Sequence, residues 1–488
     1  MPVSSLPNDY GIGSLGREAM EFVDFLAETG QTCWQVLPLN PTSYGDSPYQ
    51  SPSSHAGNPY FIDLPLLAQA GLLTQQELES SKKETTRVDY GWLFQTRYSL
   101  LRTAYARFSE NGEFVDFCRK QASWLEDYAL FMALKVHYNY APWTSWSPAH
   151  RDIVRARAQA GEYESEMNFW RWVQFVFRSQ WSALRRYARE KGVVMIGDMP
   201  IYAAHDSVDV WRAKDQFLLD DQGQPLEVAG FPPDGLSENG QLWGNPIYNW
   251  EKMESDGFQW WIDRIAASFQ LYDILRIDHF IGFENYYSIP FPSETARGGA
   301  WHKASGKALF TVVKAALPNL KIIAEDLGIV TEDVRKLLAF TGFPGMKMLQ
   351  FAFYDEDSEN LPRMYTSDNW VVYTASHDSD CTASWGQGMD KHTAARFEKE
   401  CPRDAGETIT HAMIRLAMNS RANLAMVTIQ DYLELDNEQG RMNVPASAQG
   451  NWNWRLDKNY ATEALKKKIY ALTAEGGRLA ENKKGAAL

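Results

Sequence analysis

The sequence predicts an α/β protein, a (β/α)8 barrel (TIM barrel) formed as one domain over residues 1–488, with mostly helical insertions between the barrel strands. Two observations predict this fold. Short apolar runs rich in β-branched residues recur along the chain, and helix-like segments separate them, which is typical of βα units around a parallel sheet. Several of these runs also end in an acidic residue, and in a parallel barrel the carboxyl ends of the strands meet at one mouth.

Seven runs are expected to form barrel strands. They span residues 31–39, 192–202, 273–280, 321–328, 346–355, 370–378 and 424–433. An eighth strand is expected just before the first helix, but only Met1 to Ser5 are available there. We therefore expect a barrel whose first strand is cut short.

Two long helices are predicted beside these strands. The segment from Ser14 to Thr29 places apolar residues at helical spacing and is followed by Gly30, a plausible C-terminal cap. The segment from Asn168 to Lys191 has the pattern of an aromatic-rich amphipathic helix, and Gly192 stops it.

Two intervals are too long or too irregular for a simple strand-to-helix connection. The first, from about residue 41 to 167, carries several amphipathic helical patterns, so we expect an inserted, mostly helical subdomain. The second, from about 220 to 250, is rich in Gly, Pro and Asn and is expected to form a long ordered loop over the barrel mouth.

Composition narrows the class of partner. Lys and Arg number 48 against 62 Asp and Glu, and the net charge of −14 argues against nucleic acid or an anionic membrane as a partner. A neutral substrate fits better. The chain has 18 Trp and 23 Tyr, whose flat apolar faces and polar edges suit sugars as well as protein cores.

No sequence signal indicates export or a cofactor. The four cysteines have no close pairing or metal-ligand spacing, so we expect neither a disulfide framework nor a zinc site. No run approaches eighteen consecutive apolar residues and no signal peptide is visible, so we expect a cytoplasmic protein without a membrane span. Since no phosphate-binding glycine loop follows a strand, no cofactor is expected.

The stretch ILRIDHF at residues 274–280 places charges inside an apolar strand. Side chains alternate along a strand, so Arg276 and Asp278 share one face and His279 lies on the other. We interpret His279 as a hydrogen-bonded structural residue. A charged pair on a face that is otherwise buried needs a functional explanation.

Four predicted strands end in acids, namely Asp198, Asp278, Glu325 and Asp378. A single acid at a strand end commonly caps the following turn or helix. Four acids at one barrel mouth instead predict a shared cavity. A divalent metal site is an alternative, but no local metal-ligand spacing appears, so we expect no metal.

Converging carboxyl groups suit glycosyl transfer, which needs one group ionised and another protonated. Arg276 should favour the ionised form of Asp278, as a nucleophile requires. Glu325 follows an apolar run, so burial should favour its protonated form as a general acid. Asp378 would then stabilise positive charge at the anomeric carbon or hold sugar hydroxyls, and His377 beside it can donate to a hydroxyl.

With these residues in place, the sequence resembles the 4-α-glucanotransferases (amylomaltases, or disproportionating enzymes), relatives of the α-amylases. The similarity runs nearly from end to end. Its motifs include SLPNDYGIGSLG (5–16), WQVLPLNPTSYGDSPYQ (34–50), GDMPIYAAHDSVDVW (197–211), GQLWGNPIYNW (240–250), LRIDHFIGFENYY (275–287), AEDLG (324–328), RMNVP (441–445) and NWNWR (451–455).

The resemblance implies an enzyme that moves an α-1,4-glucan segment from a maltooligosaccharide donor to the 4-hydroxyl of a glucose or glucan acceptor by a retaining double displacement. It implies that Asp278 is the nucleophile, Glu325 the acid/base and Asp378 the transition-state-stabilising acid. The further substrate contacts that it implies are Tyr49, Asp198, Trp243, Arg276 and His377.

The chain departs from the family pattern at two places that concern catalysis. Gly235 and Leu236 replace an aromatic pair in the mouth loop, which removes two platforms for the acceptor sugar. Ser379 replaces an amide beside the third acid. An α-1,4-glucan hydrolase of the same family type therefore stays open as an alternative, as does a non-catalytic glucan-binding protein.

Overall fold

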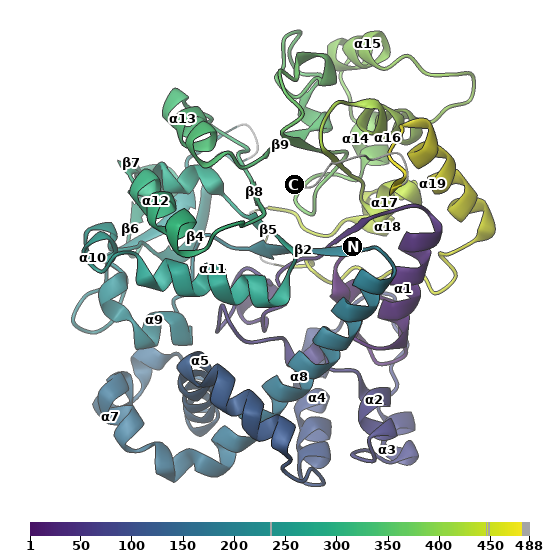
Figure 1. Cartoon of the computed structure of the whole chain (residues 1–488). Coiled ribbons are helices and arrows are strands. Elements are labelled where there is room, and N and C mark those ends of the chain that lie inside the picture. The colour runs from purple at the N-terminus through teal and green to yellow at the C-terminus, as the bar shows by residue number, and fades with distance from the viewer. Residues whose placement is uncertain (235–236, 446, 448, 481–488) are drawn as a thin grey trace.

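The computed structural model describes residues 1–234, 237–445, 447 and 449–480 (Figure 1). Within this part of the chain, seven parallel strands form one sheet in which the order in space is the order in the sequence. The strands are β1 (Cys33–Gln35), β2 (Val194–Met199), β5 (Ile274–Ile277), β8 (Ile322–Ala324), β9 (Gly345–Met348), β10 (Trp370–Tyr373) and β11 (Leu424–Met426). Six of the predicted runs contain one of these strands and the seventh overlaps β9, which begins one residue before the run, so the barrel-type fold is confirmed.

The predicted eighth strand is not formed. Residues Val3–Ser5 form a 3-10 turn, in which the Ser5 N–H donates to the Pro2 carbonyl (3.2 Å) rather than to a neighbouring strand. The terminal ammonium of Met1 donates to the Gln35 carbonyl (3.1 Å). A cavity of about 100 Å³ lies between β1 and β11, on the side where an eighth strand would close the barrel.

Helices pack around the sheet (Figure 1). The two predicted helices are α1 (Arg17–Glu28) and α8 (Glu164–Glu190), and each is followed closely by a glycine with positive φ, Gly30 at 73° and Gly192 at 76°. Other helices between or after the barrel strands are α9 (Val208–Arg212), α10 (Trp250–Ser255), α11 (Gln259–Leu271), α12 (Gly306–Ala316), α13 (Glu332–Thr341), α14 (Thr382–Gln387), α15 (Lys391–Glu400), α16 (Ile409–Asn419), α17 (Ile429–Tyr432), α18 (Asn437–Gly440) and α19 (Glu463–Glu475). No helix in the described ranges has the length and apolar character needed to cross a bilayer.

The interval between β1 and α8 holds helices and loops. Its helices are α2 (Leu64–Gln69), α3 (Gln75–Ser80), α4 (Tyr90–Tyr105), α5 (Gly112–His137), α6 (Pro148–Arg151) and α7 (Ile153–Ala158). The longest of these, α5, packs along α8 and buries Tyr128, Phe131 and Leu134. The subdomain boundaries at 41 and 167 stay a prediction.

The segment from 220 to 250, predicted as a loop, contains two strands. They are β3 (Glu227–Phe231) and β4 (Gln241–Pro246), and they join β6 (Asn285–Pro290) and β7 (Ala300–Lys303) in an antiparallel sheet of order β4-β3-β6-β7. β3 was not predicted because Gly230 interrupts the strand pattern of the segment. A side chain at Gly230 would lie 2.2 Å from the Gln241 carbonyl oxygen, so close pairing of the two strands requires glycine there.

The barrel interior is layered, which explains the charges in ILRIDHF. One apolar layer contains Ile196, Ile274, Ile323, Met346 and Val371, from five neighbouring strands. Asp198 of β2 and Arg276 of β5 are register partners. Each lies two residues beyond the isoleucine of its strand in this layer, on the same face of the sheet. The charged pair therefore lies above an apolar floor, toward the carboxyl ends of the strands.

Candidate active site

Arg276 holds two of the strand-end acids together. Its Nη1 donates to both carboxylate oxygens of Asp198 (2.6 and 2.7 Å) and to Oδ1 of Asp278 (3.0 Å). The Arg276 and Asp198 side chains are only 5% and 0% exposed, whereas that of Asp278 is 26% exposed. The buried charges of Arg276 and Asp198 are thus paired with each other, and Asp278 faces the open end of the barrel.

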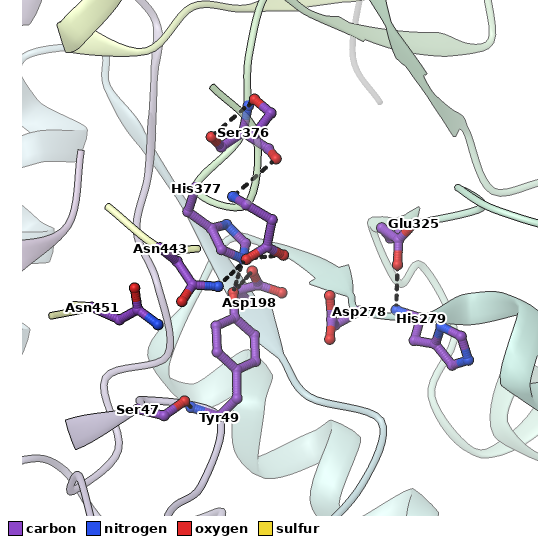
Figure 2. A network of polar contacts seen from close by, with 12 residues as sticks. Ser47, Tyr49, Asp198, Asp278, His279, Glu325, Ser376, His377, Asn443 and Asn451 are labelled. Atoms are coloured by element: carbon purple, nitrogen blue, oxygen red, sulfur yellow. Dashed lines mark hydrogen bonds and ion pairs between the residues drawn. The ribbon is translucent and has the colours of Figure 1, made fainter. Parts of the chain in front are cut away.

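Tyr49 and His377 extend this group on one side (Figure 2). The Tyr49 hydroxyl donates to Oδ2 of Asp198 (2.9 Å) and lies 3.0 Å from Nε2 of His377. The two rings are stacked, with centroids 5.3 Å apart. Nε2 of His377 also lies 3.1 Å from Oδ2 of Asp378, so one chain of contacts runs from Asp198 to Asp378.

Glu325 stands on the other side of Asp278 (Figure 2). It follows β8 directly and is 8% exposed. Its Oε2 accepts from the His279 N–H and its Oε1 from the Leu327 N–H, both at 2.7 Å. His279 has φ 49° and ψ 49°, a left-handed conformation that is uncommon for a residue other than glycine. This backbone turn, next to Asp278, aims the amide at Glu325.

The acids in this cleft have unlike pKa values. Burial raises the pKa of Asp278 to about 6, although the Arg276 guanidinium acts in the opposite direction. Burial likewise raises the pKa of Glu325 to about 8, against the lowering by Arg276 and by the two backbone N–H groups, with Asp278 adding to the rise. At neutral pH Asp278 is therefore mostly ionised and Glu325 mostly protonated. The expected effect of Arg276 on Asp278 is present, but burial outweighs it.

The pKa of Asp378 is shifted in the opposite direction, to a lower value. Enclosure in the cleft alone would raise its pKa, but the charge and hydrogen bond of His377 and the hydrogen bond of Asn443 outweigh that effect and lower it to about 2. Burial lowers the pKa of His377, and Asp378 more than reverses this, so the net pKa of His377 is raised. Asp378 stays ionised throughout the neutral range.

Trp243 lies on β4 of the antiparallel sheet. Its ring packs edge to face on the His279 ring, with centroids 4.9 Å apart. His279 is hydrogen-bonded, as expected, through its backbone N–H, while its ring Nε2 is buried and has no hydrogen-bond partner among the described residues. The ring lies between the aromatic rings of Trp243 and Phe231. Because β5 ends at Ile277, the strand alternation used in the prediction does not extend to His279.

Sequence reasoning missed three residues of this site. Asn443 donates from Nδ2 to Oδ1 of Asp378 at 2.6 Å, and Nη2 of Arg441 donates to the Asp378 carbonyl at 3.1 Å. Trp452 packs against the Tyr49 and His377 rings, with centroids 5.6 and 5.8 Å away. All three lie in the RMNVP and NWNWR stretches, which carried the resemblance but no assigned role. The substituted pair Gly235 and Leu236 lies outside the described residues.

A parallel barrel whose mouth gathers an ionised carboxylate, a protonated carboxyl group and a second carboxylate of low pKa is typical of retaining glycosyl-transferring enzymes. Comparisons with known proteins agree. Residues 1–461 match the family model described as 4-alpha-glucanotransferase. The chain therefore belongs to the 4-alpha-glucanotransferase family, and the resemblance seen in the motifs is confirmed.

Individual relatives cover nearly the whole chain. It is 45% identical to the 4-alpha-glucanotransferase of Clostridium butyricum, over 98% of this chain and 100% of the relative. It is 44% identical to that of Streptococcus pneumoniae, over 99% and 97%. The solved amylomaltase of Streptococcus agalactiae, in complex with acarbose, is 39% identical and covers 98% of each chain with a TM-score of 0.94.

Proposed function

We propose that this protein transfers α-1,4-glucan segments from a maltooligosaccharide donor to the 4-hydroxyl of glucose or of another glucan. The observation that carries the proposal is the pair of unlike carboxyl groups on either side of one opening, Asp278 with a pKa of about 6 and Glu325 with a pKa of about 8. Family membership and the surplus of negative charge support a neutral glucan as substrate. The cysteine pattern supports a cytoplasmic location.

The first half-reaction would cleave the donor. The Asp278 carboxylate attacks the anomeric carbon, and the glycosidic bond breaks as Glu325 gives its proton to the departing oxygen. A covalent glycosyl ester on Asp278 results, and a shortened glucan leaves. Asp378, ionised and held by His377 and Asn443, stabilises the positive charge that develops at the anomeric carbon.

The second half-reaction would use the same groups in reverse. Glu325, now ionised, removes the proton from the 4-hydroxyl of the acceptor, whose oxygen attacks the anomeric carbon and releases Asp278. Two inversions give net retention. Tyr49, Asp198, Arg276, His377 and Trp243 are proposed to contact the sugars, and the Asp198–Arg276 ion pair fixes the position of Asp278 through its third hydrogen bond.

The product profile from maltotriose tests the proposal. Transfer yields glucose together with oligosaccharides longer than maltotriose, while the concentration of reducing ends stays nearly constant. Hydrolysis, the second candidate that the loss of the mouth-loop aromatics favours, instead raises the reducing ends steadily. Asp278→Asn should abolish either reaction. If that variant and the wild type both leave maltotriose unchanged while binding it, the protein is a glucan-binding protein and the proposal is wrong.

A matched control is available at the opposite end of the same strand. Asp273 precedes β5 and pairs with Arg185 (2.8 Å) and with Arg189. Asp273→Asn removes one carboxylate from the barrel but leaves the strand-end group intact. We expect it to lower the thermal stability while the maltotriose product profile stays the same.

A further inference from the structure

An exposed apolar rim lies beside the general acid. It consists of Phe231, Trp301 and Ile329, and is called the acid-side rim below. Trp301 is 40% exposed and Ile329 is 51% exposed, and Phe231 is partly exposed. Large apolar groups that are exposed close to one another commonly mark a contact surface.

The Trp301 ring packs against two other aromatic rings. It is on β7, opposite Tyr287 of β6, and packs against the Tyr287 ring at 5.3 Å and edge to face on the Phe231 ring at 6.0 Å. Tyr287 is itself buried and donates from its hydroxyl to the Ala296 carbonyl (2.8 Å). The Trp301 side chain therefore loses little conformational freedom when a ligand stacks on it.

The acid-side rim is continuous with the catalytic strands. The Phe231 ring lies edge to face near the His279 ring, with centroids 6.3 Å apart. It also lies 3.6 Å from where a side-chain carbon at Gly328 would be, three residues after Glu325. The rim thus adjoins the loop that carries Glu325, whereas Tyr49 and His377 lie on the other side of Asp278 (Figure 2).

The position of the acid decides which sugar would meet this rim. A general acid must reach the glycosidic oxygen that leaves, so the glucose unit beyond that oxygen lies on the acid's side of the cleft. The leaving segment and the incoming acceptor occupy the same place in turn. The apolar face of a glucose ring in that place suits an aromatic side chain.

We propose that Trp301, supported by Phe231, is a stacking platform for the glucose units on the leaving-group and acceptor side of the cleft. The proposal rests on the proposed function. It would give this chain an aromatic contact for the acceptor sugar, where the sequence has Gly235 and Leu236 in place of the family's aromatic pair. Trp301 would then set acceptor affinity rather than the rate of bond cleavage.

Binding to a protein that cannot turn over tests the platform directly. In the Asp278→Asn background, titration calorimetry with maltoheptaose should give a Kd that Trp301→Ala raises about tenfold. Trp301→Phe, which keeps a ring, should remain within about threefold of the parent. Tyr470→Ala, at an aromatic residue that is 47% exposed on α19, a helix drawn on the opposite side of the molecule from β7 (Figure 1), should leave the Kd unchanged.

Thermal melting identifies variants that fail to fold, and Trp301→Leu preserves the apolar packing without a ring. An unchanged Kd in folded Trp301→Ala and Trp301→Leu would overturn the platform. In the active protein, Trp301→Ala should raise the KM for acceptor glucose about tenfold at unchanged kcat. If the wild type only hydrolyses maltotriose, the proposed function fails, yet the calorimetric comparison still decides whether Trp301 binds glucan.

Discussion

The two walls of the cleft shift the pKa of a carboxyl group in opposite directions. On one wall, Glu325 is 8% exposed, accepts only from backbone N–H groups and has its pKa raised to about 8. On the other, the Asp378 side chain is 48% exposed, has a histidine and an amide as partners, and has its pKa lowered to about 2. Asp278 lies between Glu325 and His377, the histidine partner of Asp378 (Figure 2).

The comparison shows that side-chain partners and burial, rather than residue type, set which carboxyl group is protonated and which is ionised near pH 7. Backbone N–H groups favour the ionised form of Glu325, but burial beside Asp278 outweighs them. At Asp378, His377 supplies a charge that burial does not cancel. Two carboxyl groups with separated pKa values in one cleft are the requirement for acid-assisted displacement.

The largest effect is expected when Glu325, on the buried wall, can no longer donate a proton. Glu325→Gln keeps the shape but has no proton to donate, and kcat/KM with maltotriose should fall about 1,000-fold. With maltosyl fluoride, whose leaving group needs no protonation, the first half-reaction should recover most of its rate. Stopped-flow release of fluoride measures this.

Asp326→Asn provides the matched control for that experiment. Asp326 is the next residue, is also buried, and accepts from the Met346 N–H (2.7 Å) rather than facing the acids of the cleft. Its replacement should leave kcat/KM within about threefold. Equal losses in both variants, or a loss in Glu325→Gln that maltosyl fluoride does not relieve, would mean that burial at this wall serves stability and not proton donation.

The next largest effect is expected from replacing Asn443, whose side-chain amide donates to Asp378 on the exposed wall. Asn443→Ala removes the 2.6 Å hydrogen bond to Asp378, and a hydrogen bond to a charged group of this kind supports a fall in kcat/KM of about 10- to 100-fold. Asn443→Asp should fall further, because a like charge raises the pKa of Asp378. Steady-state kinetics at pH 7, with thermal melting as the check on folding, gives the ranking. The reverse ranking would show that Asn443 only fills space.

Local patterns in the sequence were enough to predict the seven barrel strands, because each is a short apolar run between helical segments. They also predicted which acids meet, since parallel strands of one barrel end at one mouth. Asn443 was not predictable, because its contact with Asp378 joins residues 65 positions apart and no periodicity marks it. The degree of burial at Asp278 was equally hidden. The neighbouring Arg276 was visible in the sequence, but the desolvation that outweighs it depends on the folded cleft.

The smallest effect, and the one that reports on both walls together, is the pH dependence of kcat/KM for the wild type. In the proposed mechanism the active form has Asp278 ionised, which requires a pH above about 6, and Glu325 protonated, which requires a pH below about 8. The profile should be a bell with its maximum near pH 7, falling about tenfold per pH unit beyond either limb. Asp378, with a pKa of about 2, should add no limb between pH 4 and 10. Initial rates with maltotriose across that range measure the profile, and a plateau that continues down to pH 4 would show that burial does not control Asp278.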